Sequence, residues 1–538
     1  MLSPLTALPK NAKVAVGGSG IAGLSFAYFL AKMRPDVSVT LYEKAARNSG
    51  WINSWQTKDK NGQPVMIERG PRTLRGVSDG TVMMIDAMKD LKSLDIVHFI
   101  EHNSDADKKF LLDPNDKLVK VPDSFLSGIK FIMSDLGKGI IPAMLGEFWR
   151  KASANPGKDE TVASMLDRRM GNEHLGKNVF SAIYRGIYAD DINTLSAKKV
   201  MHKMVANELK FGSNTKALIH SMKTKKDRKK NADSLTLILD KYTKVMGKEE
   251  SKILELSKKL KHYPMLGFKG GLESFCQTLL KGLESMPNVS VLNNSAITKL
   301  ISDAKSDNNN ITVEINHGKS TEKFDHVRLT GIPHRLGPLL REIDGHIADS
   351  LETIKANTVV LVNFYLPDKD VIPKKNRGFG YLVPESNPNK EKLLGVIFDS
   401  VIEQNLKNIE NAQEMVSSDK KSYTKLTAMV GGYMYNDPAT GEPVVPKDEQ
   451  IIDAVRNTLE RHLGVSPNDL DRGLWQVTPA NKCLPKYNVG YMDWQTDMEK
   501  KILKLFNNKV SIGGMGFAIG PGIPDVFADG FQDALKLR

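Results

Sequence analysis

The chain has 538 residues, is 40% hydrophobic and 26% charged, and carries a formal net charge of +13. This length exceeds the size at which one hydrophobic core keeps growing, so we expect two or three domains, interrupted in sequence. No run approaches the roughly 18 apolar residues of a membrane-spanning helix. Cys276 and Cys483 have no histidine at ligand spacing, which excludes zinc and iron–sulfur sites.

The first predicted element is a short apolar strand at Lys13–Val16, which a glycine-rich turn joins to an amphipathic helix over 24–33. The turn matches G-x-G-x-x-G. Its glycines allow a tight turn, close approach of the backbone to a pyrophosphate and close helix–strand packing, while the helix N-terminus favours negative charge. We therefore expect a dinucleotide here. The predicted contacts are Gly18, Ser19, Gly20, Ile21, Ala22 and Gly23.

A second strand is predicted where apolar residues alternate over 37–41, after Pro35-Asp36 breaks the helix. Glu43 ends this strand about 20 residues after the glycine turn, where a carboxylate accepts hydrogen bonds from ribose hydroxyls. Glu43 and the following Lys44 are therefore assigned to the cofactor site. The alternative is a structural glycine turn followed by an unrelated glutamate.

Two segments after Glu43 favour FAD over a nicotinamide cofactor. They resemble the R-x-G-G turn and the G-P-R stretch of amine-oxidase-type flavoproteins, with Ser49 in place of the first glycine of the turn. The resemblance implies contacts with the pyrophosphate and the flavin, and it assigns Arg72 to the flavin's surroundings. ARNSGW (46–51) contributes Arg47 and Trp51, and IERGPRT (67–73) contributes Gly70, Pro71, Arg72 and Thr73.

Three later segments resemble returns of the chain to a flavin domain. MLGFKGGLESF (265–275) precedes VSVLNNSAITKL (289–300), in which Ile297 has the position expected beside adenine. FDHVRLTGIPHRL (324–336) resembles a strand and proline turn near the flavin. The last return, 510–530, predicts a strand, a glycine-rich loop and a helix whose N-terminus can stabilise a reduced flavin. Its predicted contacts are Met515, Pro521, Gly522 and Ile523; a plain Gly/Pro loop is the alternative.

Seven further motifs resemble the protoporphyrinogen oxidase family, most closely its fungal mitochondrial members. They are GPRTLRG, DKKFLLDP, DETVASMLDRRMG, YRGIYADDINTLS, GFGYLVP, LGVIFDS and CLPKYNVGY, beginning at residues 70, 107, 159, 184, 378, 394 and 483. The resemblance implies oxygen-dependent oxidation of protoporphyrinogen IX to protoporphyrin IX by FAD, with release of hydrogen peroxide, in haem biosynthesis. Hydride loss from a bridging carbon needs no strong protein base, so no catalytic acid or base is assigned.

The resemblance also implies a substrate pocket over the flavin. Leu382 and Met429 form its apolar walls, with the backbone of Phe379 and Gly380 facing the pyrroles. Lys109 stands where family members often have an arginine for the substrate's propionates, and a lysine lacks the bidentate fork. Ordinary core packing is the alternative for Leu382 and Met429, and a solvated Lys108–Lys109 pair is the alternative for Lys109.

The segment 125–150, FLSGIKFIMSDLGKGIIPAMLGEFWR, mixes large apolar residues with lysines and predicts helices lying in an anionic membrane interface. Core helices are the alternative. The family implies peripheral, monotopic attachment to the mitochondrial inner membrane on its intermembrane-space side, with ferrochelatase as product acceptor and a homodimer left open. No secretory signal or long transit peptide is evident, so import is expected to use a shorter or internal signal.

We therefore predict an α/β protein with a discontinuous Rossmann-like FAD-binding domain (1–92, 253–335 and 474–538), a helical membrane-associating region (93–215) and a mixed-sheet substrate-binding domain (336–473). The tract over 216–252 is predicted to be a lysine-rich insertion whose role we do not assign; within it, MKTKKDRKKNADS (222–234) is predicted to be a solvated surface segment, and no nucleic-acid module surrounds it. Two other functions share this scaffold: an amine or polyamine oxidase, and a flavin-retaining membrane scaffold protein. Peroxide formation with porphyrinogen but not with amines would distinguish the oxidase from both.

Overall fold

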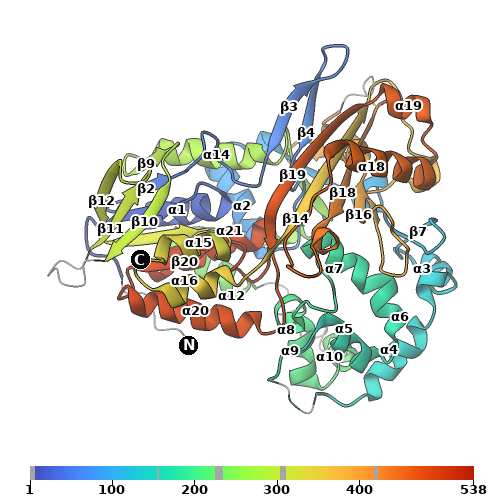
Figure 1. The fold of residues 1–538 in the computed structure, drawn as a ribbon, viewed down its shortest axis with the longest axis horizontal. Helices are drawn as coiled ribbons and strands as arrows, with labels where there is room; N and C mark the ends of the chain where they lie inside the picture. Colours follow the sequence, from blue (N-terminus) through green and yellow to red (C-terminus); the bar gives the residue numbers. More distant parts are fainter. Residues whose placement is uncertain (1–6, 154, 156, 224–233, 303–309, 417–421) are drawn as a thin grey trace.

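A computed structural model describes residues 7–153, 155, 157–223, 234–302, 310–416 and 422–538. Two large sheets lie side by side, and a group of helices lies below the second (Figure 1). The two ends of the chain meet, because the backbone N–H of Leu8 donates to the carbonyl of Leu537 (3.1 Å). The start and the end of the sequence therefore belong to the same part of the fold.

The first sheet is parallel and has the order β20-β13-β1-β2-β9. Apart from the partly exposed edge strand over 289–292, its strands are short and mostly buried on both faces, as in other parallel sheets. The strands are β1 (Lys13–Gly17), β2 (Ser38–Tyr42), β9 (Val289–Leu292), β13 (His326–Thr330) and β20 (Val510–Gly513).

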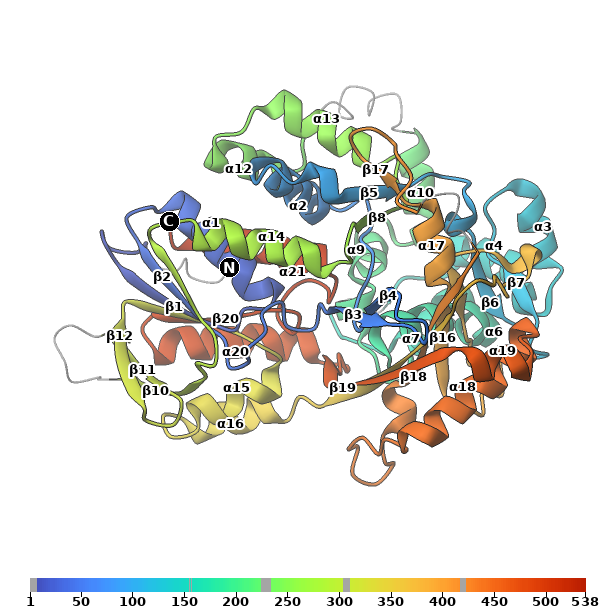
Figure 2. The ribbon, with the colours of Figure 1, turned by 90° about the horizontal axis from the view of Figure 1, so that it is seen from above.

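Helices cover one face of this sheet, where Val14 and Val16 join the largest apolar core (Figure 2). These helices are α1 (Ile21–Met33), α2 (Asp79–Asp90), α12 (Leu237–Met246), α13 (Glu250–Leu260), α14 (Glu273–Glu284) and α21 (Ile523–Lys536). Ala15 points to the opposite core. That core includes the antiparallel strands β10 (Ile297–Ser302), β11 (Ile311–Ile315) and β12 (Ser320–Phe324), with α15 (Pro333–Leu340), α16 (Gly345–Glu352) and α20 (Tyr491–Leu505).

The second sheet is mixed and has the order β19-β14-β18-β16-β15-β6-β7, with β15 parallel to β6 and the other pairs antiparallel. The strands are β6 (Lys109–Leu112), β7 (Leu118–Lys120), β14 (Ala356–Leu366), β15 (Gly380–Leu382), β16 (Leu393–Ile397), β18 (Thr424–Gly431) and β19 (Leu474–Pro485). On one face, Tyr381, Val396 and Ala428 pack in a core with α18 (Asp448–Leu463). α17 (Asp399–Asn405) and α19 (Pro467–Arg472) complete this body.

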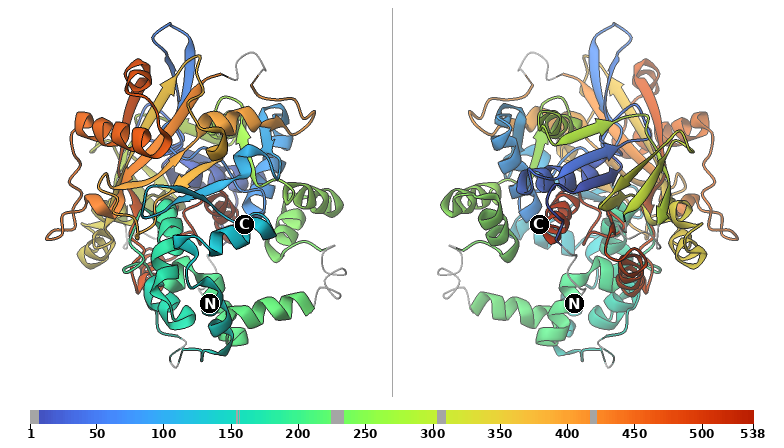
Figure 3. Two further views of the ribbon diagram at one scale, coloured as in Figure 1. Left: turned by 90° about the vertical axis from the view of Figure 1, so that its right-hand side faces the viewer. Right: turned by 90° about the vertical axis from the view of Figure 1, so that its left-hand side faces the viewer.

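The third part is helical and projects from the second sheet (Figure 3). It contains α3 (Phe125–Ile132), α4 (Ile140–Trp149), α5 (Val162–Met170), α6 (Glu173–Leu175), α7 (Ser181–Tyr188), α8 (Ala197–Val200), α9 (His202–Phe211) and α10 (Asn214–Lys223). A buried ion pair between Arg169 and Glu147 (2.5 Å) joins α5 to α4. In the described part of the chain, no helix is both long and apolar enough to span a bilayer.

Two small sheets connect these parts. β3 (Ser54–Lys58) and β4 (Pro64–Glu68) form a projecting hairpin, and β5 (Val97–Ile100) lies between β8 (Met265–Phe268) and β17 (Lys407–Asn408). Some elements pack with a different part of the protein from the one predicted for their segment. β6 falls within 93–215 and β19 within 474–538, yet both belong to the mixed sheet, and α12, within 216–252, packs in the first core. Local patterns cannot reveal such partners, because strand pairing depends on distant segments.

The predicted solvated, lysine-rich surface tract falls mainly on 224–233, outside the described residues. The division into functional domains stays a prediction, since the sheets alone do not assign a ligand to each part.

Candidate cofactor and substrate site

The glycine-rich turn lies between β1 and α1, at the carboxyl edge of the parallel sheet. A Cβ added at Gly23 would lie 1.9 Å from the carbonyl oxygen of Gly18, which itself has a φ of +101°. Within the described residues, no side chain caps α1 at Gly20 and no acidic residue lies in its first turn. The first N–H groups of α1 therefore face a position suited to an anion.

Glu43 lies beside this turn, at the end of β2. Its carboxylate accepts hydrogen bonds from the backbone N–H of Ser19 (3.0 Å), the hydroxyl of Ser19 (2.9 Å) and the backbone N–H of Ala45 (2.9 Å). Glu43 is buried, whereas Lys44 is exposed. The structure thus brings the predicted ribose acceptor and the glycine turn together, as a dinucleotide site requires.

The loop that follows is fastened to the same turn. The N–H of Ser49 donates to the carbonyl of Ser19 (3.0 Å), and a Cβ added at Gly50 would lie 3.1 Å from the Cα of Gly20. Ser49 has a φ of +77°, a conformation that glycine adopts more easily. Arg47 donates to the carbonyl of Ile52 (2.9 Å) and to Glu273 (2.8 Å), so its guanidinium braces the loop.

The Gly70–Thr73 segment lies against this loop. A Cβ added at Gly70 would lie 2.1 Å from the carbonyl oxygen of Trp51. Pro71 is exposed, and Thr73 is half-buried. The side chain of Arg72 forms a buried ion pair with Asp399 (2.5 Å), a residue of the second body. Arg72 therefore fixes its segment to that body, a partner that the sequence did not indicate.

A polar network extends from Asp399 across the mixed sheet. Asp399 accepts from the hydroxyl of Thr427 (2.7 Å), and Asn363 donates both to that hydroxyl (2.7 Å) and to the carbonyl of Glu68 (3.2 Å). Burial raises the pKa of Glu68 to about 7, although the N–H of Leu272 and the hydroxyl of Ser54 hydrogen-bond to it. The network joins the 68–72 segment to the mixed sheet and to the loop before α14.

Ile297 lies on the other side of the glycine turn. Its Cδ1 is 3.2 Å from a Cβ built at Gly17, and Leu329 is similarly close (3.3 Å). These contacts explain the glycine at position 17, where an aliphatic side chain would be crowded. The predicted contact of Ile297 with adenine stays a prediction.

The loop after β20 also reaches this edge. A Cβ added at Gly514 would lie 3.6 Å from the Cβ of Ala22, so the loop lies against the start of α1. Met515, Pro521 and Gly522 are half-buried in this loop, and Ile523 begins α21. Together, the glycine turn, Glu43 and this loop form a setting that fits a dinucleotide.

The predicted substrate walls share one face of the mixed sheet. Leu382 pairs with Gly395, which pairs with Met429, which pairs with Leu361. β18 is an inner strand and its other residues are buried, yet Met429 is partly exposed, which indicates space above it. Met429 also packs in one apolar cluster with Trp51. This cluster brings the predicted cofactor and substrate residues together.

The backbone of Phe379 and Gly380 is hydrogen-bonded within the mixed sheet or packed closely against it. Phe379 donates its N–H to the carbonyl of Lys108 (2.7 Å) and accepts from the N–H of Phe398 (2.9 Å). Gly380 is enclosed as well, because an added Cβ would lie 2.1 Å from the carbonyl oxygen of Val396. β15 is an inner strand, and Gly380 shares the sheet face that bears Leu382, so the approach of this backbone to the pyrroles stays a prediction.

Lys109 lies next to this strand and pairs with Gly380 in register. Its side chain is 53% exposed and 3.3 Å from the carboxylate of Asp107. Lys109 and Leu111 alternate with the core residue Phe110, so Lys109 shares the sheet face that bears Leu382. The ammonium group thus lies at the margin of the predicted pocket, where it also donates to the carbonyl of Asp107 (3.1 Å).

Several residues at this site were not singled out from the sequence. Asp399 forms the ion pair with Arg72, and Leu361 and Cys483 belong to the apolar cluster. Two of them lie within motifs that carried the family resemblance, LGVIFDS and CLPKYNVGY. Those motifs were the available signal, while Leu361 resembles any apolar strand residue.

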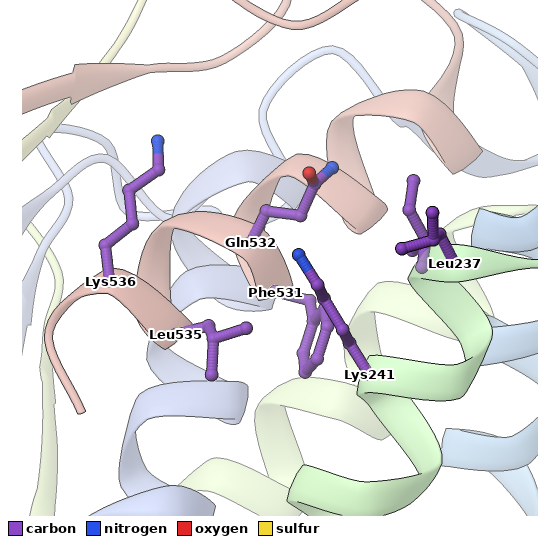
Figure 4. Close-up of a pocket in the computed structure, with 7 residues that line it drawn as sticks. Leu237, Lys241, Phe531, Gln532, Leu535 and Lys536 are labelled. Atoms are coloured by element: carbon purple, nitrogen blue, oxygen red, sulfur yellow. The ribbon is translucent and has the colours of Figure 1, made fainter. Parts of the chain in front are cut away.

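A separate depression of about 220 Å³ opens between α12 and α21 (Figure 4). Its lining residues are Leu237, Ile238, Lys241, Phe531, Gln532, Leu535 and Lys536. Phe531 lies eight residues into α21, about 12 Å along the helix from the loop after β20. This depression is therefore not part of the cofactor site.

Comparisons with known proteins agree with this geometry. Residues 16–91 match the family model described as an NAD(P)-binding Rossmann-like domain. The chain is 48% identical to the protoporphyrinogen oxidase of Saccharomyces cerevisiae, covering 100% of both chains, and 31% identical to that of Schizosaccharomyces pombe, covering 97% of this chain and 98% of the relative. A crystal structure from Exiguobacterium, provisionally named a protoporphyrinogen oxidase, aligns with a TM-score of 0.67 at 19% identity over 99% of this chain and 100% of that one.

These findings confirm the predicted α/β class with a Rossmann-like dinucleotide-binding domain and a mixed sheet. The crystal structure supports the fold alone at its level of identity. The two fungal relatives match essentially from end to end, so the similarity includes both sheets and the helical part.

Proposed function

The chain belongs to the protoporphyrinogen oxidase family, and on that premise we propose that it uses FAD and molecular oxygen to oxidise protoporphyrinogen IX to protoporphyrin IX, releasing hydrogen peroxide. The observation that carries the proposal is that Trp51, from the cofactor side, and Met429, from the mixed sheet, pack against the same apolar cluster. Apolar side chains between a dinucleotide site and a sheet suit an uncharged tetrapyrrole core.

The glycine turn, Glu43 and the loop after β20 would hold FAD, which accepts a hydride when bound. The chain's own contribution is orientation and exclusion of water. Met429, Leu361 and Leu382 provide a flat apolar wall for the macrocycle, while α7 closes one side of it, since a Cβ added at Gly186 would lie 2.7 Å from Leu382. No catalytic acid or base is assigned.

One anaerobic experiment tests this function. Mixing the purified, flavin-loaded protein with protoporphyrinogen IX should bleach the flavin absorbance, and admitting oxygen should restore it with release of peroxide. Putrescine and spermine should leave the absorbance unchanged. Bleaching by amines alone would indicate an amine oxidase, and a bound flavin that no donor reduces would indicate a scaffold protein.

We expect Lys109→Ala to raise KM for protoporphyrinogen by about tenfold with little change in kcat. The ammonium group would form a charge-assisted contact with a propionate, and that contact is the same in the ground and transition states. Steady-state kinetics measure both constants. Lys108→Ala is the matched control, because Lys108 pairs with Asp105 (2.6 Å) on the other side of the strand end. Equal effects of both variants would argue against a propionate contact.

The helical part supports the proposal of membrane attachment. Phe125 is 87% exposed, Met133 80% and Trp149 81%, all on α3, α4 or the turn between them. Monomeric soluble proteins rarely expose so many large apolar side chains in one region, whereas an interfacial helix inserts them among lipid headgroups. The same segment carries Lys130 and Lys138, which suit anionic lipids.

A triple variant, Phe125→Ser, Met133→Ser and Trp149→Ser, should lose at least about tenfold in its affinity for vesicles, because each large apolar side chain contributes roughly 1.5–3 kcal/mol when buried. Co-sedimentation with vesicles containing phosphatidylserine measures the change. Val444→Ser is the control, since Val444 is 63% exposed but belongs to a loop beyond the mixed sheet. Unchanged sedimentation of the triple variant would exclude this surface as the attachment site.

The setting that follows from these proposals is the mitochondrial inner membrane, with the protein attached peripherally on the intermembrane-space side. A substrate and product of low solubility favour such a position. Ferrochelatase is the proposed acceptor of the product, because it uses protoporphyrin directly. Subcellular fractionation with protease protection would test the location.

A further inference from the structure

Four consecutive carbonyls of the loop after β20 are each bound by a side chain on the same side of the loop. Three donors come from the start of α20 or just before it, at four-residue spacing, and the fourth is Lys199 of α8. The bonds are Tyr487 hydroxyl to Met515 (2.7 Å), Tyr491 hydroxyl to Gly516 (2.8 Å), Gln495 Nε2 to Phe517 (2.5 Å) and Lys199 Nζ to Ala518 (2.7 Å).

Lys199 is an unusual member of this set, because lysines are rarely buried. It is 4% exposed, and its ammonium group also donates to Oε1 of Gln495 (2.9 Å). The rings of Tyr487 and Tyr491 each lie 5.5 Å from the ammonium group. The amide of Gln495 thus links Lys199 to the preceding carbonyl of the loop, since its Nε2 donates to the carbonyl of Phe517.

The ammonium group is charged at neutral pH. Burial lowers the pKa of Lys199 to about 8, while the carboxylates of Glu499 and Asp529 oppose this change. His202 and Asp525 lie near the same group of helices. Burial and the neighbouring carboxylate of Asp533 raise the pKa of Asp529 itself.

We infer that Lys199 is a positioning residue for the flavin, holding the loop over 514–522 in place and favouring the reduced, negatively charged form of the cofactor. The inference rests on the proposed function. The loop lies between Lys199 and the predicted cofactor site. On one side, α20 and Lys199 bind its carbonyls; on the other, Gly514 lies against Ala22 at the start of α1. Because a trans peptide directs its N–H opposite to its C=O, binding the carbonyls fixes the orientation of these peptides; the N–H groups of Phe517 and Ala518 both donate to the carbonyl of Gly514 (2.9 Å), so the turn is held between that carbonyl and the donors of α20 and Lys199.

The charge of Lys199 adds to this arrangement. In a buried environment, a unit charge acts over longer distances than in water, and negative charge that develops on the far side of the loop is stabilised. An uncharged side chain at position 199 would keep the fold's packing but remove this contribution. The reduction equilibrium of the flavin is therefore the property that distinguishes positioning by charge from a purely structural role.

The experiment compares wild type with Lys199→Met and Lys199→Arg, and with Lys198→Met as the control. Lys198 belongs to the same helix but pairs at the surface with Asp493 (2.8 Å). Flavin content, thermal midpoint and reduction potential against a reference dye are measured for each holoprotein. In Lys199→Met, the ratio of reduced to oxidised flavin at a fixed potential should fall about tenfold. Lys199→Arg and Lys198→Met should match wild type.

An unchanged reduction equilibrium in a flavin-loaded Lys199→Met protein would overturn the inference, whatever its thermal midpoint. If that variant retains no flavin, Lys199→Gln replaces it, because the amide keeps a donor for Ala518 and lacks the charge. A wild-type equilibrium in Lys199→Gln would overturn the inference equally. Absence of flavin from the wild-type protein would instead contradict the proposed function.

Discussion

Replacing Gly23 with alanine is expected to yield a protein that lacks bound flavin and unfolds at a lower temperature. The new Cβ would lie 1.9 Å from the carbonyl oxygen of Gly18, so the turn and the first residues of α1 must separate. Overpacking of this kind costs about 1–3 kcal/mol, and occasionally more. The N–H groups at the start of α1 would then no longer converge on one phosphate position. Flavin absorbance and a thermal unfolding scan measure both effects.

Helix propensity alone would predict that this substitution stabilises the protein. Alanine is favoured over glycine by about 1 kcal/mol inside a helix, and Gly23 lies within α1. Gly345→Ala is the matched control, since Gly345 begins α16 and an added Cβ there would meet no atom within 4 Å. We expect that control to keep its flavin and its thermal midpoint. A Gly23→Ala protein with full flavin content would show that the turn does not bind the cofactor.

Neutralising Asp399 is the second change for which we expect a large loss of stability. Asp399→Asn leaves the guanidinium of Arg72 buried beside an uncharged partner, and both side chains are only 7% exposed. Breaking a buried pair in this way costs about 3–5 kcal/mol. The Gly70–Thr73 segment loses its attachment to the second body, so flavin should also dissociate faster. Thermal unfolding and the rate of flavin release after dilution measure the two consequences.

Two further variants separate charge from packing. Asp493→Asn removes one partner of an exposed pair with Lys198, in which Asp493 is 71% exposed, and should change stability by less than about 1 kcal/mol. The double variant Arg72→Met, Asp399→Leu removes both buried charges and should recover much of the stability that Asp399→Asn loses. Equal stability of Asp399→Asn and wild type would mean that the pair does not hold the segment.

Much of the cofactor side could be predicted from the sequence. The spacing of Gly18, Gly20 and Gly23 depends on contacts within one turn, and Glu43 follows from the regular length of a strand–helix–strand unit. The substrate side was predicted less completely. Leu382 and Met429 are separated by 47 positions but lie on either side of Gly395, because β16 runs between their strands. The approach of the Phe379 and Gly380 backbone to the pyrroles stays a prediction, and the structure adds that β15, which carries Gly380, is an inner strand.

By itself, the sequence determined the features that depend on local geometry and on family resemblance. These are the glycine turn that must pack against its own helix, the acidic residue after the second strand, and motifs that place the chain among the protoporphyrinogen oxidases. Only the tertiary structure decided which groups the charged and aromatic residues meet. Arg72 binds Asp399 across 327 positions, and Lys199 reaches Ala518 across 319. Such contacts arise from the packing of distant elements, and no local pattern encodes them.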